Sequence, residues 1–107
     1  MTLGQKQRLF ARLVAHLINH AYALGYEISL GHAYRSLDEC KRLGFANSNH
    51  GKKLAIDINL FKDGRYLRST ESHRQLGQFW ESLHPLCRWG GRFNDGNHYS
   101  LEHNGVK

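Results

Sequence analysis

The sequence predicts an α+β domain in which helices pack against a small, mainly antiparallel sheet. Three observations favour this class. Leucines repeat at helical spacing near the N-terminus, an apolar run at residues 54–61 has the length of a strand, and an Asp-Gly turn follows that run. With 107 residues, the chain fits a single domain, residues 1–107, that buries one modest core.

The first half of the chain predicts helix, strand and helix in that order. Residues 6–24 form a helix whose apolar side chains recur every three or four positions, and Gly25 ends it. Residues 26–30 alternate like a strand. Ser36, with Glu39 three residues later, predicts the capping box of a short helix that runs to Leu43.

The second half predicts a strand hairpin, a helix and a last strand. Residues 54–61 form a strand, Asp63-Gly64 turns the chain, and residues 66–67 begin the return strand. Ser69 or Thr70 caps a helix that reaches about residue 83, where Pro85 stops it. Further on we expect a tight segment at 89–91, a polar turn at 94–97 and a strand at 98–101.

Charge and histidine content limit the classes of function. The net charge is +6, which suits an anionic partner such as nucleic acid, anionic lipid or a phosphate-rich polymer of a bacterial envelope. The Lys and Arg residues are scattered, with no long run of like charges. We therefore expect no nucleic-acid partner. Eight histidines stand out in so short a chain, because histidine is the commonest metal ligand. Two cysteines without a CxxC pair argue against a disulfide framework.

The apolar segments are too short or too interrupted for a membrane span or a signal peptide. We expect no stable membrane insertion, a monomer, and synthesis in the cytoplasm. A substrate outside the cell would then require that the protein be released.

Two segments carry candidate chemistry. His50 precedes a strand that holds Asp57 between two isoleucines, and Asp95 lies three residues before His98. Taken singly, Asp57 suggests an ion pair with a basic side chain, because a buried carboxylate needs a partner. Taken singly, the segment around Asp95 suggests only a polar turn.

Taken together, the two segments predict a catalytic zinc site. His50, Asp57 and His98 give three protein ligands and leave the fourth tetrahedral position for water. Asp95 then supplies a carboxylate that can move a proton. The HExxH pattern of helical zinc peptidases does not occur, so the site would be built on the sheet.

The segment SNHGKKLAID resembles the SxHxxGxAxD motif of the D-alanyl-D-alanine carboxypeptidase family, which includes the L-alanyl-D-glutamate endopeptidases of phage endolysins. WGGRFNDGNHYS is similar to the second signature of that family, and AYRS resembles its YRS segment. The three matches span residues 33–100, and LNLFKDGRYL is most similar to phage and prophage members. The resemblance implies a hedgehog/D-Ala-D-Ala-peptidase-like fold.

The resemblance also implies roles for individual residues. His50, Asp57 and His98 would bind Zn²⁺, and Asp95 would act as general base and then general acid. Arg35 would bind the substrate carbonyl or stabilise the oxyanion, as suits a permanent planar cation. Ser48 would form a hydrogen bond beside the site. His32 and Lys53 are candidates to contact substrate, and Lys53 stands where the family motif has glycine.

Other residues are rivals for these roles. His103 is a rival third ligand, although strand alternation places it on the opposite face from His98. Glu102 is a rival to Asp95 as the base. His16 and His20 are four residues apart on a helix, and these two histidines, with His73 and His84, are expected at the surface.

The sequence thus predicts a zinc peptidase that cuts the peptidoglycan stem peptide, with the L-alanyl-D-glutamate bond favoured and a role in a phage or prophage lysis system. A D-alanyl-D-alanine carboxypeptidase and a non-catalytic, zinc-stabilised module that binds the cell wall are the alternatives.

Overall fold

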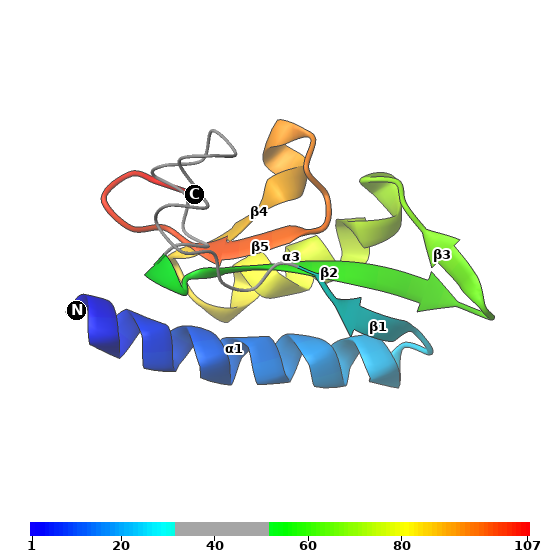
Figure 1. Ribbon diagram of the computed structural model, residues 1–107, viewed down its shortest axis with the longest axis horizontal. Coiled ribbons are helices and arrows are strands. Elements are labelled where there is room, and N and C mark those ends of the chain that lie inside the picture. The colour runs from blue at the N-terminus through cyan, green and yellow to red at the C-terminus, as the bar shows by residue number, and fades with distance from the viewer. Residues whose placement is uncertain (32–51) are drawn as a thin grey trace.

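A computed structural model describes residues 1–31 and 52–107 of the chain. Its elements are the helices α1 (Leu3–Ala23) and α3 (Arg74–Leu83), the strands β1 (Glu27–Leu30), β2 (Ala55–Lys62), β3 (Arg65–Leu67), β4 (Cys87–Trp89) and β5 (His98–Leu101), and two 3₁₀ turns, Glu71–His73 and Gly90–Phe93. The predicted α+β class is confirmed (Figure 1). The helix predicted after Ser36 lies outside the described residues.

The long helix α1 begins three residues earlier than its leucine repeat predicts. Thr2 caps it, because its hydroxyl accepts the amide of Gln5 while the Gln5 side chain accepts the amide of Thr2. The helix ends where Gly25 takes a left-handed backbone, with φ of 90°. The predicted apolar stripe is confirmed in its buried members, Phe10, Leu13, Leu17 and Ala21.

The sheet is built around β2, which pairs with three other strands. The described strands form one five-stranded sheet in the order β1-β2-β5-β4, with β3 also paired to β2, and every pairing among them is antiparallel. The hairpin predicted at Asp63-Gly64 is confirmed. Strand β4 was not predicted, since three residues before a glycine pair carry too little pattern to identify a strand.

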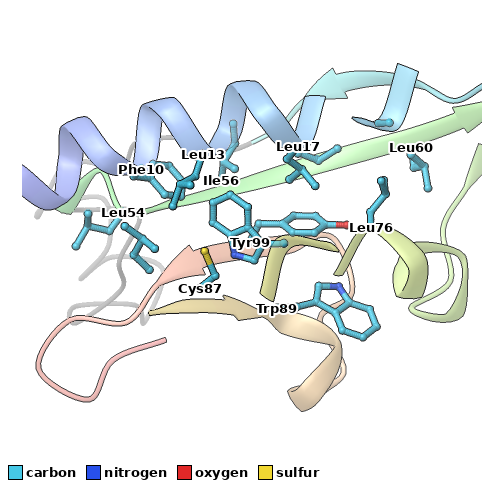
Figure 2. Close-up of a cluster of buried hydrophobic side chains, with 14 residues drawn as sticks. Phe10, Leu13, Leu17, Leu54, Ile56, Leu60, Leu76, Cys87, Trp89 and Tyr99 are labelled. Carbon is cyan, nitrogen blue, oxygen red and sulfur yellow. The ribbon is translucent and has the colours of Figure 1, made fainter. Parts of the chain in front are cut away.

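The two faces of β2 differ in burial because side chains alternate along a strand. Ile56, Ile58 and Leu60 point into the core, where α1 and α3 cover them, and Asp57 and Asn59 point to the other face. Figure 2 shows Phe10, Leu13 and Leu17 of α1 directed toward Ile56 and Tyr99. The core also holds Trp80, whose ring meets Phe10 and Tyr99 edge to face.

One predicted surface residue proves to be buried. His73 is only 2% exposed, and its Nδ1 shares a hydrogen bond of 2.7 Å with the hydroxyl of Tyr99. The prediction of a surface position for His73 was wrong, because the chain before α3 turns its polar side chain onto the hydroxyl of a core tyrosine. Burial lowers the pKa of His73 to about 4, so the ring is neutral at pH 7.

No helix within the described part of the chain is long and apolar enough to cross a membrane.

Candidate metal centre

The centre of the sheet brings two of the predicted ligands opposite each other. Asp57 of β2 and His98 of β5 are direct partners in the antiparallel register, so their side chains leave the sheet on the same face. The Nδ1 atom of His98 lies 3.6 Å from Oδ1 of Asp57. His98 is 7% exposed, and the Oδ1 atom of Asp57 is buried.

The turn before β5 carries Asp95 to this pair. Asn94 takes a left-handed backbone with φ of 60°, and the amide of Asp95 donates to the carbonyl of Gly90 at 2.8 Å. A Cβ on Gly90 would lie 2.0 Å from the Asp95 carbonyl oxygen and 2.7 Å from the His98 Cβ. Gly90 is therefore required by close packing, because any side chain there would push Asp95 away from His98.

The remaining contacts of this turn are also made by main-chain atoms. The carbonyl of Gly96 accepts the indole N–H of Trp89 at 2.7 Å, and the carbonyl of Asn97 accepts the amide of Ile58 at 2.9 Å. Trp89 is itself held against Gly77 of α3, where a Cβ would come within 2.1 Å of the ring. Buried, satisfied hydrogen bonds thus fix the position of the Asp95 main chain.

Asp57, Asp95 and His98 together form a candidate metal site. One ligand atom from each lies within 4.8 Å of the others. Zinc binds nitrogen and oxygen ligands at roughly 2.0–2.2 Å, so ligands of one ion lie about 3–4 Å apart. Small side-chain rotations would bring the three groups to that spacing. Two carboxylates and one imidazole are donors that suit zinc.

Charge on this face favours a cation. Burial lowers the pKa of His98, but the hydrogen bond to Asp57, the hydrogen bond to Lys107 and the charges of Asp57 and Asp95 outweigh it and raise the pKa above its ordinary value. The same negative charges that hold a proton on His98 would attract a metal ion in its place, since metal binding releases protons from its ligands.

Several predicted site residues lie outside the described part of the chain, namely His32, Arg35, Ser48 and His50. Lys53 is described: it is exposed and lies two residues before β2. Its φ of 59° falls in the left-handed region that glycine adopts most easily. A glycine, which the motif that this segment resembles has here, would take this backbone without strain.

The rival residues are engaged elsewhere. His103 Nδ1 lies 3.1 Å from the Lys6 ammonium, and Glu102 pairs with Arg88 at 3.4 Å. His20 stacks on Phe79 with 3.7 Å between ring centroids, and His16 is exposed. Cys87 is a free, buried thiol whose pKa is raised to about 12 by burial, so it does not suit nucleophilic catalysis.

Sequence reasoning missed one contact of the site. The main-chain oxygen of Lys107 accepts a hydrogen bond of 2.7 Å from Nε2 of His98. The signal that could have found it is the Asn104-Gly105 dipeptide, which is typical of a tight hairpin turn that returns the chain to β5.

The fold has a counterpart among solved structures. The chain is similar to the L-Ala D-Glu endopeptidase ChiX of Serratia marcescens, with a TM-score of 0.65 and 22% sequence identity over 86% of this chain and 79% of that one. At this identity the similarity establishes a shared fold. No protein-family profile matches the chain, and no curated protein sequence matches it.

Proposed function

We propose that this protein is a zinc-dependent peptidase that hydrolyses an amide bond of the peptidoglycan stem peptide. The main support for the proposal is the cluster of Asp57, Asp95 and His98 at the centre of the sheet. The chain also shares its fold with an L-Ala D-Glu endopeptidase. The L-alanyl-D-glutamate bond is the proposed target, and a phage or prophage lysis system is the proposed setting. The net charge of +6 would favour an anionic cell wall.

In this proposal Asp57 and His98 hold the ion together with His50. They suit that role because the register of β2 and β5 presents both side chains on one face, and because His98 Nδ1 and Asp57 Oδ1 already lie 3.6 Å apart. Bound zinc would polarise the scissile carbonyl and lower the pKa of water to roughly 7.

Asp95 is proposed as the group that moves the proton. It is the exposed member of the cluster, at the edge that substrate and water can reach. From there its carboxylate would accept the proton of the attacking water and pass it to the leaving amine. Arg35 is proposed to stabilise the negative charge on the carbonyl oxygen, with Ser48 beside the site and His32 and Lys53 in contact with substrate.

The test is digestion of purified muropeptides with product identification by mass spectrometry. We expect cleavage by the zinc-loaded protein, none after chelation, and a loss of about 10²–10⁴-fold in Asp95→Ala, the usual contribution of a general acid–base group. Asp63→Asn is the matched control, since Asp63 is an exposed turn aspartate in the β2–β3 hairpin. This variant should cleave as the wild type does.

Each outcome distinguishes the alternatives. Release of terminal D-alanine would replace the endopeptidase with a carboxypeptidase. Zinc binding without cleavage, together with cell-wall binding that survives Asp95→Ala, would establish a non-catalytic binding module. Retained zinc stoichiometry in Asp95→Ala supports a base, whereas lost zinc would make Asp95 a ligand.

A further inference from the structure

A second tight hairpin follows β5 and leads the chain back to the metal site. His103 and Val106 exchange main-chain hydrogen bonds of 3.0 and 2.9 Å across Asn104 and Gly105. The two central residues have φ of 51° and 79°, so both lie in the left-handed region that a type I′ turn requires. The turn therefore reverses the chain within two residues and places Lys107 beside β5.

The main-chain oxygen of Lys107 joins two side chains of β5. It accepts a hydrogen bond from His98 Nε2 at 2.7 Å and another, short one from the Ser100 hydroxyl. His98 and Ser100 are two residues apart on a strand, so they share a face, and both are buried. One oxygen atom thus fixes the far edge of the imidazole ring relative to the strand that carries it.

This contact determines which nitrogen of His98 is available to a metal. A main-chain oxygen only accepts, so Nε2 must carry a hydrogen. When the ring is neutral, its lone pair is on Nδ1, the nitrogen that faces Asp57 Oδ1 at 3.6 Å. Metal-binding histidines commonly donate their second ring N–H to a carbonyl or carboxylate, which fixes tautomer and orientation.

The hairpin is held in place by other elements. The Lys6 ammonium of α1 lies 3.1 Å from His103 Nδ1 and 3.5 Å from the carbonyl of Glu102. The amide of Glu102 donates to the carbonyl of Leu86 at 2.8 Å, and its carboxylate pairs with Arg88. Contacts with α1 and with the chain around β4 therefore fix the hairpin beside the site.

We propose that the turn at residues 103–106 is a positioning element for the candidate metal centre: through the Lys107 oxygen it holds His98 with Nδ1 directed toward Asp57. The inference rests on the proposed metal site. It adds that zinc binding depends on Gly105, which has no side chain to bind a metal but controls the orientation of His98 through the turn.

The chain contains a matched control for this turn. Asp63 and Gly64, in the β2–β3 hairpin, have φ of 52° and 76°, so they form the same kind of turn as Asn104 and Gly105. A Cβ at Gly64 or at Gly105 would meet nothing within 4 Å. Gly64→Val and Gly105→Val therefore impose the same left-handed strain with open space around the added Cβ, and the two hairpins differ in which residues they hold in place.

The experiment has two measurements. Competition with a chromophoric chelator gives the zinc dissociation constant. Long-range ¹H–¹⁵N NMR of the metal-free protein, at a pH where the ring is neutral, gives the His98 tautomer. We expect Gly105→Val to weaken zinc binding about 10–100-fold, the usual effect of losing such a partner, and to reduce the Nε2–H tautomer of His98. Gly64→Val should stay within about twofold of wild type, and Gly105→Asn should restore affinity because Asn tolerates this backbone.

The outcomes separate this inference from the proposed function. Failure of the wild type to bind zinc would contradict the metal site itself. Zinc binding in the wild type with equal affinities in Gly105→Val and Gly64→Val would overturn the positioning role alone. Tighter binding in Gly105→Val would also overturn it, because the hairpin would then obstruct the site. If Gly105→Val fails to fold, Ser100→Ala removes the second donor to the same oxygen, and an unchanged His98 tautomer and zinc affinity in that variant would count against the proposal.

Discussion

The two faces of the central sheet are built from the same strands, but one packs in the core and the other holds the candidate metal site. On β2, Ile56 and Ile58 are buried under α1 and α3, whereas Asp57 between them faces the candidate metal site. On β5, Tyr99 is buried in the core, and His98 before it belongs to the site. Because alternate side chains leave a strand on opposite faces, one strand can supply both core and site without a break in its hydrogen bonds.

Stability and metal binding should therefore be separable by single substitutions. The core face excludes water and gains free energy from burial, about 25 cal/mol per Å² of apolar surface. The site face keeps carboxylates together at a cost in charge repulsion, which a cation bound in the proposed site would offset. Substitutions one residue apart should therefore affect different properties.

The first prediction is the loss of zinc binding in Asp57→Ala. Zinc at a free concentration 100 times its dissociation constant should stabilise the wild type by about 2.7 kcal/mol, and should not stabilise this variant. Thermal unfolding with and without zinc measures the increment. The control is Asn59→Ala, the next residue on the same face, which should keep the increment. A full zinc increment in Asp57→Ala would show that Asp57 is no ligand.

On the core face, Ile58→Ala should destabilise the fold by about 2–5 kcal/mol, because it leaves a cavity under the helices. Denaturant unfolding of the metal-free protein measures this loss. The folded fraction should still bind zinc with wild-type affinity, since Ile58 points away from the site. A weakened affinity in folded protein would mean that the two faces are coupled.

The third prediction concerns the buried polar pair in the core. Burial lowers the pKa of His73 to about 4, against about 6.5 in the unfolded chain. Between these pH values the unfolded state therefore binds more protons than the folded state. Proton binding then stabilises the unfolded state increasingly as the pH falls. The contribution of His73 to the free energy of unfolding should be fully present above pH 6.5. It should fall by about 3 kcal/mol as the pH drops to about 4.

Denaturant midpoints of wild type and His73→Leu across this range measure the contribution of that histidine. The variant should lack the part of the pH slope that belongs to His73, whatever its absolute stability. Parallel pH profiles for the two proteins would contradict a neutral, buried His73.

Local sequence patterns predict most of the described elements, with β4 as the exception, and they identify the candidate ligands. The leucine repeat located α1, the Asp63-Gly64 turn located the hairpin, and the apolar run around Asp57 located β2, because helix periodicity, strand alternation and turn chemistry are local properties. The identity of Asp57, Asp95 and His98 as candidates also came from the sequence. The roles of His50, Arg35 and Ser48 remain predictions, since these residues lie outside the described part of the chain.

How these elements meet depends on tertiary packing. The register that pairs Asp57 with His98 and the burial of His73 against Tyr99 join residues far apart in the sequence that no local pattern relates. The physical reason is that these contacts arise from the packing of side chains between elements distant in sequence, and their free energy exists only once the whole core has formed.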